Sequence, residues 1–250
     1  MLAIIGGTGL TRLSTLAVAH REVVRTPYGE PSSALLFGQI AGCDAVFLAR
    51  HGHGHTIPPH RVNYRANLWA LNERGATAVL AVASVGGIRG AEPGDIVLPH
   101  QLIDYTHDRE ASYFDGGDQR VVHVDFTHPY SARLRAACVA AAASSGITLA
   151  DGGVYGAVSG PRLETAAEID RMDRDGCTLV GMTGMPEAAL ARELELPYAS
   201  IAVVVNHAAG RGDSAHEVSM EAIAAILETA MDRVRALLEH VAPLISETIE

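Results

Sequence analysis

The segment from Ala49 to Leu71, A-R-H-G-H-G-H-T-I-P-P-H-R-V-N-Y-R-A-N-L-W-A-L, decides how this chain folds. The apolar residues from Ala45 to Ala49 predict a buried strand that ends at Arg50 and His51. A loop rich in glycine and proline follows, and apolar residues then recur at helical spacing until Gly75 provides a C-terminal stop. Strand, polar loop and helix in this order indicate an α/β protein, and such proteins bind ligands where strands end in glycine-rich loops.

The residue types at the end of this strand are suited to binding an anion. Arg50 offers several fixed donors and stays charged, and His51 adds an imidazole beside it. Taken alone, the pattern fits a surface arginine among solvated histidines equally well. We predict no metal site, because the histidines cross a Gly/Pro loop and lack an accompanying carboxylate cluster.

Several other segments predict strands that run into polar or glycine-rich loops. Thr77 to Ser84 is expected to be a central parallel strand. Further strands are predicted at residues 1–5, 33–41, 43–49, 94–105, 153–158, 179–182 and 199–205, and helices at 64–74, 131–145, from 164, 186–195 and 223–241. Loops that gather at one edge of a sheet form a binding site. We therefore expect a single α/β domain over residues 1–250, with a long irregular loop from Thr106 to Ser131.

Composition narrows the class of protein. The chain has 250 residues, 48% of them hydrophobic, and a net charge of −10, which disfavours binding to nucleic acid. No apolar run is long enough to cross a membrane, and the start of the chain predicts a strand rather than a signal peptide. We expect a cytoplasmic protein whose three cysteines, at 43, 138 and 177, remain reduced.

The glycine-rich loop Gly6 to Gly9, G-G-T-G, raises a different possibility, a nucleotide-binding oxidoreductase. A dinucleotide fingerprint beginning at Gly7 would require a third glycine where Arg12 stands. A P-loop is also absent, because no Gly-Lys-Ser/Thr follows. The oxidoreductase remains an alternative from a different class, and a simple tight turn is the plainest interpretation of the loop.

Taken in order, the motifs of this chain resemble those of the trimeric purine nucleoside phosphorylase family, and most closely its methylthionucleoside branch. They are G-G-T-G at Gly6 to Gly9, A-R-H-G at Ala49 to Gly52, V-N-Y-R-A-N at Val62 to Asn67, P-G-D-I-V at Pro93 to Val97, G-P-R at Gly160 to Arg162 and G-M-T-G-M-P-E-A at Gly181 to Ala188. The resemblance implies an α/β domain with a twisted, partly barrel-like mixed sheet flanked by helices. It also implies a homotrimer, phosphate as co-substrate and no other cofactor.

The resemblance further implies phosphorolysis, in which phosphate attacks C1′ of a purine nucleoside and releases the base. Arg50, His51 and Asn206 are then the expected catalytic residues. The residues implied to bind phosphate are Thr8, Arg50, His51, Ala83, Ser84 and Thr183. Those implied to bind the nucleoside are Leu163 and Asn206 at the base, Met182 at the ribose, Met220 at the 5′ position, and His55 and His123 from a neighbouring subunit.

Asn206 and Met220 together suggest the substrate. At the position of Asn206 the adenine-preferring branch has an aspartate, and it has a second aspartate two residues later, where this chain has Ala208. An amide accepts from a purine N7–H and donates to a 6-oxo group, which suits hypoxanthine or guanine. Met220 stands where other branches hold the 5′-hydroxyl with histidine, and a thioether suits a 5′-methylthio group better. We therefore expect 5′-methylthioinosine as substrate.

Alternatives remain open at this point. His216 lies close enough to Met220 that a shifted alignment restores a hydroxyl partner, which would make inosine or guanosine the substrate. A 5′-methylthioadenosine phosphorylase and a non-catalytic purine-binding scaffold are further possibilities. Leu163 replaces the family's usual stacking aromatic, and Ala83 replaces a hydroxyl residue expected at the phosphate in methylthioadenosine enzymes.

Overall fold

A single large mixed sheet covered by helices on both faces forms the body of the molecule. The computed structural model describes residues 1–116 and 120–247. The strands are β1 (Leu2–Gly6), β2 (Ala17–Glu22), β3 (Leu35–Ile40), β4 (Cys43–Ala49), β5 (Ala78–Gly87), β6 (Ile96–Leu98), β7 (Gln101–Asp104), β8 (Ala150–Asp151), β9 (Val154–Ala157), β10 (Leu179–Gly181) and β11 (Tyr198–His207). The α-helices are α1 (Tyr64–Glu73), α2 (Ala132–Ser145), α3 (Ala166–Arg174), α4 (Gly184–Glu193) and α5 (Met220–Glu247).

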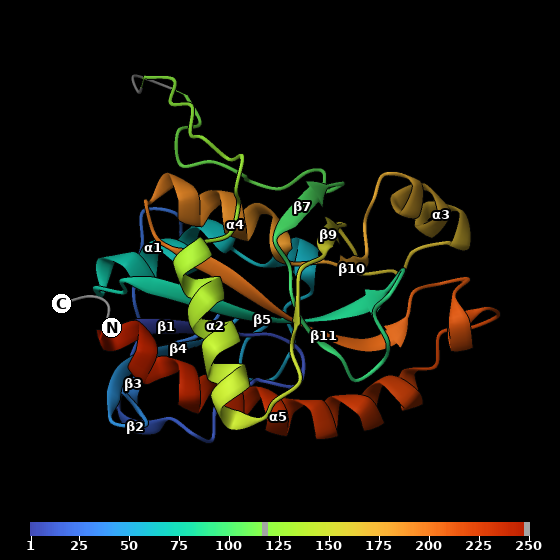
Figure 1. Cartoon of the computed structure of the whole chain (residues 1–250). Helices are drawn as coiled ribbons and strands as arrows, with labels where there is room; N and C mark the ends of the chain where they lie inside the picture. Colours follow the sequence, from blue (N-terminus) through green and yellow to red (C-terminus); the bar gives the residue numbers. More distant parts are fainter. Residues whose placement is uncertain (117–119, 248–250) are drawn as a thin grey trace.

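The helices divide between the two faces of the sheet because strand side chains alternate in direction. In β1, Leu2 and Ile4 pack into the core that α2 and α5 cover, whereas Ala3 and Ile5 pack into the core beneath α1 and α4. In Figure 1, α1 and α4 lie above the strands and α5 lies below them, while α2 crosses in front and reaches α5. Both faces are therefore buried, which explains why the central strands are apolar without interruption.

The sheet branches at β5, which pairs with β1, β10 and β11. Residues 78–81 of β5 pair in parallel with β1, and β11 runs parallel to β5 along its other edge. The end of β5, at Gly86 and Gly87, pairs antiparallel with β10. This confirms the central parallel strand predicted at Thr77 to Ser84, and the α/β fold with a mixed sheet. The carboxyl ends of β1, β4, β5 and β11 consequently open toward one region.

The predicted helix ends are explained by local hydrogen bonds. The Ser131 side chain accepts from the backbone N–H of Leu134 at the start of α2, and Gly146 closes this helix with a left-handed φ of 69°. Thr165 and Glu168 form a reciprocal capping box at the start of α3. The predicted helices at 131–145 and near 164 are thus confirmed, the second beginning at Ala166.

The structure differs from the sequence prediction at three strands. The predicted strand at 94–105 is two strands, β6 and β7, separated at Pro99 and His100. β6 pairs antiparallel with β11, whereas β7 pairs in parallel with β9, so the chain changes partners at the proline. The edge strand β2 and the two-residue β8 were not predicted, and the side chains of both are largely exposed.

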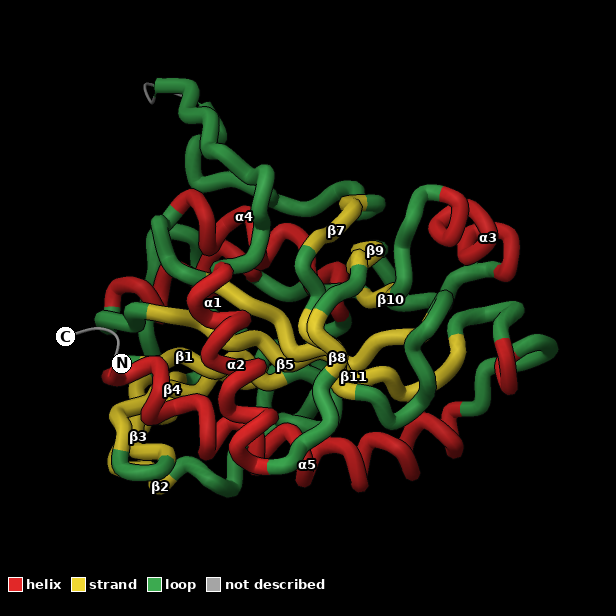
Figure 2. The backbone as a smooth tube through the Cα atoms, viewed as in Figure 1, coloured by secondary structure: helices red, strands yellow, loops and turns green. Residues whose placement is uncertain are grey.

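Residues 106–116 and 120–131 belong to the predicted long irregular loop and extend from the body of the protein beyond β7 (Figure 2). Residues 117–119 of this loop and 248–250 of the predicted single domain lie outside the described residues. Across the part of the chain that is described, no helix is both long enough and apolar enough to span a membrane. The three cysteines are free thiols.

Candidate active site

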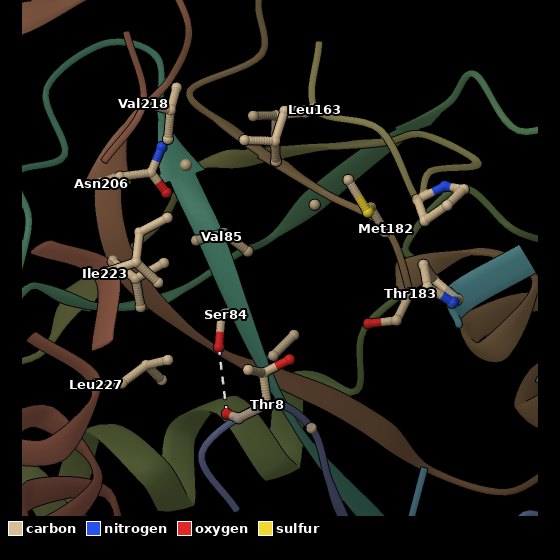
Figure 3. Close-up of a pocket in the computed structure, with 18 of the residues that line it drawn as sticks. Thr8, Ser84, Val85, Leu163, Met182, Thr183, Asn206, Val218, Ile223 and Leu227 are labelled. Carbon is tan, nitrogen blue, oxygen red and sulfur yellow. Dashed lines mark hydrogen bonds between the residues drawn. The ribbon is translucent and has the colours of Figure 1, made fainter. Parts of the chain in front are cut away.

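A cavity of about 320 Å³ opens at the carboxyl ends of β1, β4, β5, β10 and β11 and is bordered by the start of α5. It is lined by every predicted site residue except His123. In Figure 3, Thr8, Ser84 and Thr183 lie at one end of the cavity, Asn206 and Leu163 lie at the other, and Met182 lies between them. Residues from distant parts of the sequence therefore line one cavity, which has hydroxyl side chains at one end and an amide and a leucine at the other.

Arg50 supplies the positive charge at the first end. Its side chain is 1% exposed, and its Nε and Nη2 atoms donate to the Glu187 carboxylate over 2.8 and 2.9 Å. Nη1 donates to the backbone carbonyl of Val82 over 2.9 Å. Because guanidinium has five N–H donors, two have no partner among the described residues, and Arg50 lines the cavity. Burial alone would lower the pKa of Arg50, but the adjacent Glu187 carboxylate outweighs this effect and raises it above its usual value.

The backbone comes unusually close to this arginine at Gly7. A Cβ atom at this position would lie 2.8 Å from Nη1 of Arg50 and 2.6 Å from the Val82 carbonyl oxygen. Glycine is therefore required for the G-G-T-G loop to approach the guanidinium. The Ser84 hydroxyl donates to the backbone carbonyl of Thr8 over 3.2 Å and ties this loop to β5 (Figure 3).

Thr183 completes the first end of the cavity from the break between β10 and α4. It is buried, and its hydroxyl points toward the side of the cavity occupied by Thr8 (Figure 3). Its backbone N–H lies 3.4 Å from the Tyr155 hydroxyl. Gly181 makes room for that tyrosine, since a Cβ there would lie 2.1 Å from the Tyr155 hydroxyl oxygen. The threonine is thus held by packing in the core beneath it.

His51 is neutral in this environment. Burial and the neighbouring Arg50 charge lower the pKa of His51 to about 4. Its Nδ1 lies 2.8 Å from the backbone carbonyl oxygen of Ile57. A carbonyl can only accept, so Nδ1 carries the proton and Nε2 is left with a lone pair. His51 can therefore accept a hydrogen bond from a protonated oxyanion, while Arg50 supplies charge.

The second end of the cavity presents an amide from β11. The pairing of β11 with β5 is irregular between Val204 and Asn206, which redirects the Asn206 side chain. Its Nδ2 donates to the His207 backbone carbonyl over 2.6 Å, and Oδ1 points into the cavity (Figure 3). One Nδ2 hydrogen remains available. Leu163, 42% exposed, lies across the cavity from this amide.

Apolar side chains from the start of α5 and the residues before it close the remaining wall. Val218, Ile223 and Leu227 line the cavity, and Met220 lies at its rim with 67% exposure. His216 is exposed and is not a lining residue. The histidine that a shifted alignment would bring to this wall therefore does not contribute to the cavity lining.

The two histidines expected from a neighbouring subunit occupy different places. His55 lines the cavity of its own chain, with its ring centroid 4.7 Å from that of His51, and burial lowers its pKa. His123 is exposed on the long loop and does not line the cavity. Action of either residue across a subunit interface stays a prediction. Within residues 1–116 and 120–247, no group of three or more His, Cys, Asp or Glu side chains is arranged to hold a metal ion.

Comparison with known proteins identifies the family of this chain. The sequence model of the phosphorylase superfamily matches residues 1–243. The chain belongs to the phosphorylase superfamily.

Relatives of this superfamily member agree with the match over nearly the whole chain. A Pseudomonas syringae pv. tomato protein named "Probable S-methyl-5′-thioinosine phosphorylase" is 52% identical over 240 residues, covering 96% of this chain and 97% of the relative. A Thermococcus kodakarensis "Probable 6-oxopurine nucleoside phosphorylase" is 46% identical, covering 84% and 80%. The Schistosoma mansoni methylthioadenosine phosphorylase in complex with adenine superimposes with a TM-score of 0.94 at 31% identity, covering 98% and 92%.

Two residues of this phosphorylase-superfamily site were not predicted as site residues. Glu187 stands within the motif Gly181 to Ala188 and was assigned no role there, yet it is fully buried against Arg50. Glu164 was expected only as the start of a helix, yet it lines the cavity, and burial raises its pKa. The available signal for Glu164 was its position immediately after Leu163 in the loop that follows β9. The Arg50–Glu187 pair joins distant segments and leaves no local pattern.

Proposed function

We propose that this protein catalyses phosphorolysis of a 6-oxopurine 5′-methylthionucleoside, converting 5′-methylthioinosine and phosphate to hypoxanthine and 5-methylthioribose 1-phosphate. The observation that carries the proposal is the two-ended cavity. A buried arginine with free donors lies at one end, and an amide oxygen points in at the other. The names of the P. syringae and T. kodakarensis relatives support this chemistry and this class of base.

The arrangement suits displacement at C1′. Phosphate bound by Arg50, His51 and Thr183 is aimed at the sugar, so that the C1′–O bond to phosphate forms as the C1′–N9 bond breaks. The sugar passes through an oxocarbenium-like state, and negative charge moves onto the departing purine. N7 of the departing base takes up a proton from water, hydrogen phosphate releases its own proton to solvent as the sugar phosphate forms, and Oδ1 of Asn206 accepts from the resulting N7–H. This contact strengthens as the bond breaks, and it therefore favours the transition state over the ground state.

Two side chains select a 6-oxo base over a 6-amino base. The remaining Nδ2 hydrogen of Asn206 donates to a 6-oxygen but opposes a 6-amino group. Hypoxanthine also has an N1–H donor, which the Glu164 carboxylate at the same cavity can accept, whereas adenine N1 is itself an acceptor. The S. mansoni methylthioadenosine enzyme has a similar fold, but Asn206 and Glu164 favour the opposite base here.

The wall formed by Val218, Ile223 and Leu227 favours a 5′-methylthio group over a 5′-hydroxyl, because a buried hydroxyl needs a partner. One observation favours a second candidate, inosine or guanosine, since His55 lines the same cavity and can hydrogen-bond a hydroxyl. We also propose a cytoplasmic homotrimer that uses phosphate as co-substrate and no further cofactor.

The proposal is tested by incubating the purified protein with 5′-methylthioinosine in the presence and absence of phosphate. We expect hypoxanthine and 5-methylthioribose 1-phosphate in equal amounts, and no reaction without phosphate. Release of hypoxanthine with free 5-methylthioribose in phosphate-free buffer would identify a hydrolase instead. Absence of base release from any purine nucleoside would contradict the proposed reaction class.

A further inference from the structure

Tyr198 is connected to Arg50, at the phosphate end of the cavity, through the carboxylate of Glu187. The Tyr198 hydroxyl donates to Oε1 of Glu187 over 2.8 Å, and both side chains are buried. The same oxygen accepts from Nη2 of Arg50, while Oε2 accepts from Nε. Three hydrogen bonds therefore fix the carboxylate, and the carboxylate in turn fixes the plane of the guanidinium.

Tyr198 lies on the same strand as Asn206, the residue at the other end of the cavity. It is the first residue of β11, the strand that carries Asn206 near its other end. Burial raises the pKa of Tyr198 well above 10, so its hydroxyl remains a donor at neutral pH. A neutral donor stabilises the carboxylate without competing with Arg50 for charge. Without this donor, the Glu187 carboxylate would keep Arg50 as its one hydrogen-bonding side chain among the described residues.

Tyr130 provides an internal comparison. Its ring is nearly parallel to that of Tyr198, with an interplanar angle of 19° and centroids 6.1 Å apart, and it is equally buried. Among the described residues, however, its hydroxyl has no hydrogen-bond partner. The two tyrosines thus share their packing environment and differ in whether the hydroxyl reaches Glu187.

We propose that Tyr198 is a positioning residue for phosphate, whose hydroxyl holds Glu187 so that Arg50 presents its two remaining N–H donors to the cavity. This inference rests on the proposed function, because it takes phosphate to be the ligand of Arg50. It assigns Tyr198 no contact with substrate. Its effect is on the orientation of the guanidinium and hence on phosphate affinity.

The test compares Tyr198→Phe with the matched control Tyr130→Phe, each of which removes one buried hydroxyl and keeps the ring. We expect Tyr198→Phe to raise the KM for phosphate about five- to twentyfold, since a hydrogen bond to a charged group is lost. The nucleoside KM should stay within about twofold, and Tyr130→Phe should leave both constants unchanged. Glu187→Gln, a second variant of similar size, should raise the phosphate KM at least as much.

Thermal unfolding with added inorganic phosphate gives a second readout. Phosphate should raise the Tm of the unaltered protein and of Tyr130→Phe, and should raise that of Tyr198→Phe less. Equal phosphate constants for the two tyrosine variants would overturn the inference while leaving the proposed function standing. A rise in nucleoside KM as large as that for phosphate would show a general structural role and overturn it too. An unaltered protein that neither responds to phosphate nor consumes it would overturn both.

Discussion

Replacing Asn206 with aspartate should shift the preference for the base strongly toward adenine. In the structure, Oδ1 of Asn206 points into the cavity and Nδ2 donates to the His207 carbonyl, with one hydrogen left for a ligand. Aspartate keeps the oxygen that accepts from N7–H but has no amide donor. The variant therefore sets an acceptor against the 6-oxygen of hypoxanthine, while it can accept from the 6-amino group of adenine.

The size of the effect follows from one hydrogen bond lost and one gained. An unsatisfied polar group costs about 1–3 kcal/mol, and a new hydrogen bond to a charged carboxylate contributes about 1.5–3 kcal/mol. Together these give about 2.5–6 kcal/mol in the difference between the two substrates. Since about 1.4 kcal/mol is tenfold, the ratio of kcat/KM for methylthioinosine to that for methylthioadenosine should fall about 60- to 20,000-fold.

The assay is base release from each nucleoside at saturating phosphate, with Asn72→Asp as a control that makes the same change of charge on α1, away from the cavity lining. Asn72→Asp should leave the ratio unchanged. If Asn206→Asp folds with an unaltered Tm and the ratio shifts by less than about threefold, the hydrogen-bond reasoning at Asn206 is refuted.

Three further predictions follow from the rest of the site. Lysine cannot reproduce the bidentate contact that Arg50 makes with Glu187. In Arg50→Lys, kcat/KM for phosphate should therefore fall about 100-fold, and the free energy of unfolding should fall by about 2 kcal/mol. Unchanged kinetics would contradict the role of Arg50. His51 has its pKa lowered to about 4, so the unfolded chain binds the extra proton first as pH falls below about 6.5. Urea unfolding should therefore show that the unaltered protein loses about 2 kcal/mol more stability between pH 7 and 4.5 than His51→Gln, and equal losses would show that His51 is not neutral in the fold. Glu164→Gln replaces an acceptor-only carboxylate with an amide. The variant should lower kcat/KM for methylthioinosine about tenfold and change that for methylthioadenosine little. Equal losses for both substrates would exclude a contact between Glu164 and the N1–H of the 6-oxopurine.

The fold could be predicted largely because most of its strands are buried on both faces. Short continuous apolar runs, such as those that end near Arg50 and Ser84, are typical of parallel strands covered by helices on both faces. The edge strand β2, A-V-A-H-R-E, was missed because both its faces are largely exposed and its residues follow no hydrophobic period. The division of β6 from β7 required knowledge of the partners on either side of Pro99.

The strand end at Arg50 could be recognised from the residue types alone, whereas Thr183 and Asn206 were implied only by the resemblance to the nucleoside phosphorylases. All three line the same cavity, and their roles stay predictions. Glu187 and Tyr198 were not predicted as site residues, because their importance arises from contacts between segments far apart in the sequence. A buried carboxylate in a helix resembles any other acidic residue until its arginine is placed beside it.

The measurement that bears most directly on function is kcat/KM for phosphate-dependent base release from 5′-methylthioinosine, 5′-methylthioadenosine, inosine, guanosine and adenosine under the same conditions. We predict that methylthioinosine leads by at least one order of magnitude over inosine, because of the apolar 5′ wall. It should lead by two or more orders over methylthioadenosine, because of Asn206 and Glu164. A lead for methylthioadenosine would contradict the assignment of the base, and a lead for inosine or guanosine would contradict that of the 5′ group.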